Sequence, residues 1–284
     1  MNAGVKSAEL TGSVADGRAL WVANAWGERL AAAGVRSAED LLDRLEGERL
    51  DKPSLPSWRQ RLRVELPGLG RCYLKRYAQP PAGVQLRRLA SGGLGRSTAA
   101  MEWGRIQQLE RAGIGTLNGL AMAQRMVGPW ERVSAVLLAE LGGASLESYA
   151  VRHSQRVAKQ MIAALADFVG RFHGAGWVHR DLYLCHVFVE WQDAEPSFRL
   201  IDLARMFRPR FRGRRWRVKD LAALNYSTPA SVATPSDRLR FLKRYLAIGK
   251  LDPAGRRLAR RIAVKTARIA RHDARRRQAE EAAV

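Results

Sequence analysis

Apolar residues in the first half of the chain follow a strand-like pattern. From Arg61 to Leu66 polar and apolar residues alternate, Pro67–Gly70 has the composition of a turn, and Arg71–Tyr77 is again strand-like. This pattern predicts a β-hairpin. Farther along, Val133–Leu141 is an apolar run of strand length that ends at Gly142-Gly143. The first half therefore contains the predicted strands of a sheet.

Helical spacing dominates the second half. The clearest helix lies between Ser154 and Phe172, where apolar residues recur at intervals of 4, 4, 3 and 4 from Val157. An earlier helix is expected to begin at Ser97 or Thr98, either of which can cap it, and to stop at Gly113. Other expected elements are short amphipathic helices within 26–50, strands over 187–190 and 198–201, and helices that start at Asp220 and span 239–246.

Charge narrows the class of partner. The formal net charge is +22, and arginines supply 41 of the 49 basic residues. The planar guanidinium binds phosphate through two hydrogen bonds, so nucleic acid, anionic lipid headgroups and phosphorylated glycolipids all fit. Part of the arginine excess is also what a GC-rich genome produces. No known nucleic-acid motif appears and the basic residues are spread throughout, so we do not expect nucleic acid.

Composition also indicates the compartment. The two cysteines, Cys72 and Cys185, form no C-x-x-C pair, which favours a reducing cytoplasm. No run approaches the roughly 18 apolar residues of a membrane-spanning helix, and Met1–Gly17 lacks a signal-peptide pattern. We expect a cytoplasmic protein, with peripheral contact to an anionic membrane on the cytoplasmic face of the inner membrane as an open alternative.

Four residues occur in an order that suits phosphoryl transfer. This reaction needs a carboxylate to orient the attacking hydroxyl, a second carboxylate for metal, and a lysine on the phosphates. Asp181, in His179-Arg-Asp, and Asp202, in Leu200-Ile-Asp, stand at the two ends of a predicted hairpin. Lys75 on a strand and Glu102 on the next helix fit an ion pair. Each residue alone is as well explained by an ordinary structural role, and the order carries the prediction.

The longer motifs resemble one family. They are His179-Arg-Asp-Leu-Tyr-Leu-Cys-His186, Leu200-Ile-Asp-Leu-Ala-Arg205 and Arg215-Trp-Arg-Val-Lys-Asp-Leu-Ala-Ala-Leu224, with looser agreement at 73–76, 102–103 and 113–116. Over about residues 61–246 the chain resembles the lipopolysaccharide core kinases, which phosphorylate heptose or Kdo sugars. The resemblance implies a bilobal protein-kinase-like fold, use of ATP and Mg²⁺, and an acidic glycolipid acceptor.

The resemblance also implies roles for individual residues. Asp181 would be the catalytic carboxylate, Lys75 the phosphate-binding lysine with Glu102 as its partner, and Asp202 the metal ligand. His186 stands where protein kinases place asparagine, and it would coordinate metal directly, act through water, or hold Asp181.

The nucleotide-binding segments show one departure and one expectation. No G-x-G-x-x-G motif precedes the lysine, so Trp58–Gln60 is left to cover the phosphates. Adenine is expected at the backbone of Glu140 and Leu141. His173 is expected to be structural.

The segment between Asp202 and Asp220 suggests the acceptor. It holds eight basic residues, no Ser, Thr or Tyr, and no Ala-Pro-Glu motif. We expect no activation by phosphorylation there and an acidic sugar acceptor rather than a protein. A solvated charged loop is the plain alternative for this segment.

Three other functions remain open for the chain. They are a pseudokinase, a protein or aminoglycoside kinase of the same fold, and a nucleic-acid-binding protein.

These observations predict an α+β fold in four parts. Residues 1–53 form an N-terminal helical extension, 54–141 a small β-rich N-lobe, 142–250 a mainly helical C-lobe, and 251–284 a basic C-terminal helix or tail. The predicted function is ATP-dependent phosphorylation of a sugar hydroxyl of the lipopolysaccharide core.

Overall fold

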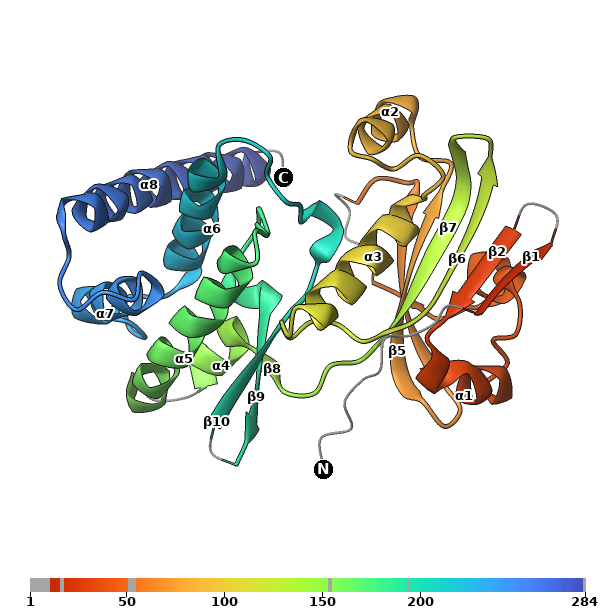
Figure 1. Ribbon diagram of the computed structural model, residues 1–284, viewed down its shortest axis with the longest axis horizontal. Coiled ribbons are helices and arrows are strands. Elements are labelled where there is room, and N and C mark those ends of the chain that lie inside the picture. Colours follow the sequence, from red (N-terminus) through yellow and green to blue (C-terminus); the bar gives the residue numbers. More distant parts are fainter. Residues whose placement is uncertain (1–10, 16–17, 51–54, 153–154, 194, 283–284) are drawn as a thin grey trace. The chain divides into compact units, whose positions relative to one another are not determined.

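The computed structural model describes residues 11–15, 18–50, 55–152, 155–193 and 195–282. It divides into two compact units, one of Met1–Arg111 and Leu117–Leu141 and the other of Ala112–Thr116 and Gly142–Val284. Antiparallel strands dominate the first unit and helices the second (Figure 1), which confirms the predicted α+β class with a β-rich and a helical lobe. Two sequence-based expectations lie outside the described residues. Most of Met1–Gly17, which lacks a signal-peptide pattern, is not described, and neither is the side chain of Val157, the first apolar residue of the clearest predicted helix.

The first unit is built on one sheet of order β1-β2-β6-β7-β5-β4-β3, in which all neighbours are antiparallel. The strands are β1 Thr11–Ala15, β2 Arg18–Val22, β3 Glu48–Arg49, β4 Arg59–Leu66, β5 Gly70–Ala78, β6 Gly119–Val127 and β7 Trp130–Ala139. The predicted hairpin is β4–β5, with Arg61 opposite Lys75.

Alternation along β5 decides what each face of the sheet carries. Successive side chains of a strand point to opposite faces, so Leu74 packs into one apolar core while Lys75 and Tyr77 lie on the other face. Helix α3 (Thr98–Arg111), predicted from its cap, packs against β5, β6 and β7. The same periodicity that builds the core therefore aims Lys75 at α3.

The first 50 residues differ from the predicted helical extension. They include strands β1 and β2, which join the sheet at β6, and the short helices η1 Asn24–Trp26, α1 Gly27–Ala32 and η2 Asp40–Arg44. Leu30, Leu41 and Leu42 are buried in one cluster with Leu74. This segment completes the sheet and its core, since the apolar face of the sheet must be covered.

Helices form most of the second unit. They are α4 Leu146–Arg152, α5 Gln155–Gly174, α6 Gly213–Ser227, α7 Pro235–Tyr245 and α8 Pro253–Glu281, with single turns η3 Leu184–His186 and η4 Leu203–Arg205. A small sheet joins β8 Ala144–Ser145, β9 Val187–Gln192 and β10 Glu195–Leu200. The helix expected from Asp220 starts seven residues earlier, at Gly213, and Asp220 lies inside it.

Gly143 shows why the predicted stop after β7 needs glycine. Its φ is +81°, and a Cβ atom would lie 2.2 Å from the carbonyl oxygen of Val189 on β9.

No helix among the described residues has the length and apolar composition needed to cross a bilayer.

Candidate active site

Lys75 and Glu102 form an ion pair inside the first unit. Lys75 Nζ lies 2.6 Å from Glu102 Oε1, and the hydroxyl of Tyr77 donates to Glu102 Oε2 at 2.9 Å. Glu102 is fully buried. A buried carboxylate is retained only when it is paired, so α3 holds the ammonium of Lys75 in one place.

The loop that carries Asp181 is anchored by Asp220 in the second unit. Asp220 is fully buried, and its carboxylate accepts from the backbone N–H groups of His179 at 2.7 Å and Arg180 at 2.8 Å. Arg180 has a φ of 74°, a left-handed conformation that costs energy outside glycine. The two hydrogen bonds offset that cost and fix the direction of Asp181, the next residue.

The same loop is tied to the segment that carries Asp202. The Nε2–H of His179 donates to the carbonyl oxygen of Ile201 at 2.9 Å, and burial lowers the pKa of this imidazole, which keeps it neutral. Val178 and Phe207 exchange two backbone hydrogen bonds. Asp202 also has a left-handed backbone, with φ of 56°. Strained residues of this kind cluster at functional sites.

Two cations lie at the carboxylate of Asp181. Arg205 Nη1 is 2.9 Å from Oδ2, and Lys219 Nζ is 3.6 Å from Oδ1. Burial lowers the pKa of Lys219, partly opposed by the charge of Asp181. Both residues belong to the basic segment that the sequence analysis assigned as a whole to the acceptor, so their contact with Asp181 was not predicted.

His186 lies between the two aspartate segments. Its Nδ1 is 2.7 Å from the carbonyl oxygen of Asp181, and its Nε2 is 3.9 Å from Asp202 Oδ2. Burial lowers the pKa of His186, but hydrogen bonds to Cys185 and the Asp181 carbonyl, with the charge of Asp202, outweigh it and raise the pKa to about 9. Since a carbonyl oxygen can only accept, Nδ1–H of His186 donates to the backbone of Asp181, and Nε2 faces Asp202.

The residues expected to bind the nucleotide lie at the ends of two strands of the sheet in the first unit, after β7 and at the start of β4. The carboxylate of Glu140 accepts from Arg71 at 3.0 Å and Tyr73 at 3.1 Å, and Leu141 follows it half-buried. The guanidinium of Arg59 lies 5.7 Å from the ring of Trp58, at the start of β4.

His173 has the structural role expected of it. It is buried, with Nδ1 2.9 Å from the Tyr245 hydroxyl and Nε2 3.3 Å from Asp220 Oδ2. Together with the backbone of His179 and Arg180, it satisfies the Asp220 carboxylate.

The first unit is an antiparallel sheet with a lysine–glutamate pair, and the helical second unit joins the segments of Asp181 and Asp202. These features define a protein-kinase-like phosphotransferase. The lipopolysaccharide kinase (Kdo/WaaP) family model matches residues 59–245. The chain belongs to that family.

Individual relatives agree with this assignment. Lipopolysaccharide core heptose(I) kinase WaaP of Pseudomonas aeruginosa is 32% identical over 197 residues, which are 66% of this chain and 73% of the relative. The WaaP of Escherichia coli K12 is 31% identical over 183 residues, 60% and 69% of the two chains. A solved structure of WaaP in complex with acyl carrier protein aligns with a TM-score of 0.63 and 28% identity, covering 86% of this chain and 94% of that one.

Proposed function

We propose that this protein transfers the γ-phosphoryl group of ATP to a heptose hydroxyl of the lipopolysaccharide core. The observation that carries the proposal is the Asp181 loop, fixed by buried Asp220 and joined through His186 to Asp202. Three relatives named as heptose(I) kinases support the choice of sugar.

The donor set fits Mg²⁺ that is shared with a nucleotide. Magnesium prefers oxygen and usually takes one or two carboxylates plus substrate phosphates. Asp202 offers a carboxylate, and no group of three His, Cys, Asp or Glu side chains within the described ranges is placed to hold a metal by itself. Asp202 would hold the ion, which would neutralise charge on the phosphates. His186 would position both aspartate segments.

The other residues have separate tasks in phosphoryl transfer. Asp181 accepts the proton of the sugar hydroxyl and orients its oxygen for attack. Lys75, held by Glu102, binds the phosphates, and the backbone near Glu140 and Leu141 binds adenine. Lys219 and Arg205 place positive charge beside Asp181, where negative charge gathers during transfer.

The direct test is transfer of radiolabelled γ-phosphate from ATP to truncated lipopolysaccharides that end at either Kdo or heptose, with and without Mg²⁺. We expect label on the heptose-containing acceptor only, and only with Mg²⁺. Label on Kdo alone or on protein alone would contradict the choice of acceptor. No transfer to any acceptor would favour a pseudokinase.

The basic segment after Asp202 suits an acceptor that carries phosphate. Arg212, Arg214 and Arg215 are exposed at the start of α6. Changing all three to glutamine should raise the acceptor KM about tenfold or more, because each loses a charge-assisted hydrogen bond, and should leave the ATP KM unchanged. Steady-state kinetics measure both. The triple change Arg256→Gln, Arg257→Gln and Arg260→Gln on α8 is the control. An unchanged acceptor KM would remove this role.

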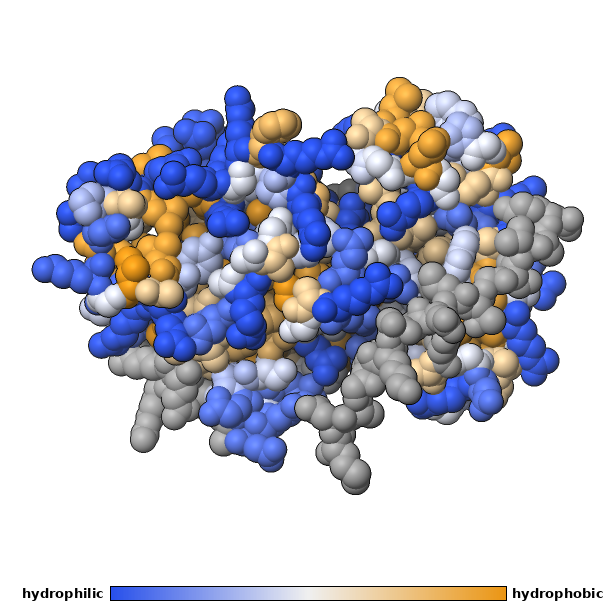
Figure 2. All heavy atoms as spheres, in the orientation of Figure 1, coloured by the Kyte–Doolittle hydropathy of each residue, from blue (hydrophilic) through white to orange (hydrophobic). Residues whose placement is uncertain are grey.

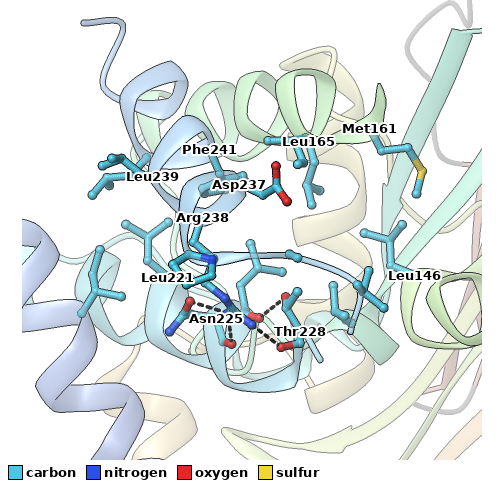
Figure 3. A pocket seen from close by; sticks show the side chains of 18 of the residues that line it. Leu146, Met161, Leu165, Leu221, Asn225, Thr228, Asp237, Arg238, Leu239 and Phe241 are labelled. Atoms are coloured by element: carbon cyan, nitrogen blue, oxygen red, sulfur yellow. Dashed lines mark hydrogen bonds between the residues drawn. The ribbon is translucent and has the colours of Figure 1, made fainter. Parts of the chain in front are cut away.

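An acyl carrier protein is a second partner that we propose for this chain. The second unit holds an apolar cavity of about 390 Å³ among α4, α5, α6, α7 and α8. Figure 3 shows Leu146, Met161 and Leu165 on its wall, while Arg238 bonds to Asn225 and Thr228. Its size is that of ligand pockets. The solved complex of WaaP with acyl carrier protein makes a protein-borne acyl chain the best-supported occupant.

Filling the cavity tests that proposal. Leu165→Trp should weaken binding of a long-chain acyl carrier protein about tenfold or more, because each buried methylene contributes about 0.8 kcal/mol. Leu165→Met, of similar volume, should bind normally. Calorimetric titration measures the affinities. If the unacylated carrier binds wild-type protein as tightly as the acylated one, the cavity does not hold the chain.

A further inference from the structure

Half of the large apolar side chains that are exposed in the described residues belong to one part of the first unit. Leu86 is 58% exposed, Leu94 74%, Val127 51% and Trp130 41%. They come from α2 (Ala82–Ala90), from the loop after it and from the β6–β7 turn. Figure 2 shows apolar side chains gathered over α2. Scattered apolar residues are ordinary, but a cluster marks an interaction surface. We call these four residues the α2 patch.

Buried Arg88 holds the three segments of the α2 patch together. It is only 5% exposed although it carries a charge. Its guanidinium donates to the carbonyl oxygens of Gly93 and Arg96 in the loop and of Pro129 in the turn. One side chain of α2 thus fixes the loop that bears Leu94 and the turn that bears Trp130.

Gln85 makes a second connection. Its side chain accepts from the N–H of Glu131 at 2.8 Å and donates to the carbonyl oxygen of Glu131 at 3.1 Å. The Glu131 carboxylate, itself buried, accepts from the backbone and hydroxyl of Thr98. The exposed apolar side chains therefore stand on a scaffold that is ordered before any partner arrives.

The exposed charges on the segments that carry the α2 patch are of one sign. Within 79–100 and 119–134 the sole acidic residue is Glu131, which is buried. Arg87, Arg125 and Arg132 in these segments are exposed. Segments that combine exposed apolar residues with exposed arginines, and that carry no exposed carboxylate of their own, are complementary to a surface that is apolar inside and anionic outside.

We propose that the α2 patch docks this protein on an anionic phospholipid bilayer. Leu86, Leu94, Val127 and Trp130 enter the boundary between headgroups and acyl chains, and the arginines bind lipid phosphates. Tryptophan favours this interface. A second copy of the chain is a poorer partner, because a twofold contact would bring the same arginines face to face. The proposal deepens the proposed function, since the acceptor is a lipid-anchored sugar.

Helix α8 is the competing surface. Its exposed side carries Arg260, Arg261 and Arg268. Among the described residues of α8, Val264 is the one large apolar residue that is exposed, at 61%. Charge alone gives adsorption without insertion. The two surfaces therefore predict different sensitive residues, which makes Val264→Glu the matched control.

Vesicle co-sedimentation of the full chain decides between them. The wild-type protein should bind vesicles of phosphatidylcholine mixed with anionic phosphatidylglycerol. It should bind vesicles of pure phosphatidylcholine only weakly. Leu86→Glu with Leu94→Glu should lower the partition coefficient about tenfold or more, because two leucines leave the apolar boundary, whereas Val264→Glu should stay within about twofold. Because these side chains are exposed, unchanged thermal unfolding is expected and shows that the variants fold.

A second measurement reports insertion directly. Brominated lipids should quench part of the wild-type tryptophan emission, and this part should disappear in Trp130→Phe. Unchanged sedimentation of the leucine variant, no binding by wild type, or loss of binding in Val264→Glu alone would each overturn the proposal. Lipid binding needs no acceptor, so this result is separate from the phosphoryl-transfer assay that tests the proposed function.

Discussion

Asp181→Asn is expected to lower kcat about 10²–10⁴-fold while the protein folds normally and the KM for ATP hardly changes. Asparagine fills the same space and can still accept from Arg205, which lies 2.9 Å from Oδ2 of Asp181. It cannot take the proton of the sugar hydroxyl, so the loss falls on the chemical step. Single-turnover transfer of labelled phosphate, with ATP saturating, measures that step.

A matched control separates this effect from general damage. Asp193→Asn changes an exposed aspartate in the β9–β10 turn, where φ is 49° and asparagine is tolerated. We expect it to retain wild-type kcat. Full activity of the Asp181→Asn protein would exclude a base at this position.

Asp220→Ala is expected to lower the free energy of unfolding by about 3–5 kcal/mol, the range for removing one member of a buried charged network. The substitution leaves the backbone N–H groups of His179 and Arg180 without their acceptor. It also removes the contact to His173. Arg180 would then lose the bonds that offset its left-handed backbone. Urea unfolding followed by circular dichroism measures the change.

Asp220→Asn sharpens the interpretation. Its amide oxygen can accept from one of the two N–H groups, but its amide nitrogen faces the other donor. We expect a smaller loss of stability than for alanine and still a large loss of kcat, because Asp181 follows directly after Arg180. If alanine and asparagine both leave stability and kcat unchanged, Asp220 does not anchor the loop.

Elements with a local signal could be predicted from the sequence. Alternation over 61–77 predicted the β4–β5 hairpin, and the expected helix start at Ser97 or Thr98 is confirmed, with the Ser97 hydroxyl accepting from the N–H of Ala100 at the start of α3. Because strand alternation and helix periodicity also set which way side chains point, the pairing of Lys75 with Glu102 could be anticipated. The resemblance of the longer motifs pointed to the family that the comparisons show.

Elements whose local composition conflicts with their tertiary role were missed. Helix α2 was missed because the whole segment 78–95 is rich in Pro, Gly and Arg, although Ala, Gln, Leu and Arg within the helix itself favour it. Strand β6 is buried on both sides over Leu120–Gln124, so it lacks alternation. Strand β2 is recognisable only through its pairing with β6.

The site residues that were missed depend on long-range contacts. The sequence analysis expected a helix to start at Asp220, but Asp220 lies within α6 and binds backbone 40 residues earlier. Lys219 precedes it, so the same helix brings its ammonium to Asp181. The motif over 215–224 contains both residues, but a single sequence does not show which distant groups they contact.

Arg180 has a consequence for how the protein can be controlled. Its guanidinium lies 5.8 Å from the ring of Phe207 and 5.3 Å from that of Trp216. In many protein kinases a newly added phosphate must recruit arginines to order this region, but here two aromatic rings already occupy that position and residues 203–219 offer no hydroxyl. Because residues 203–219 contain no Ser, Thr or Tyr, phosphorylation of a hydroxyl within this segment cannot be the signal that orders it.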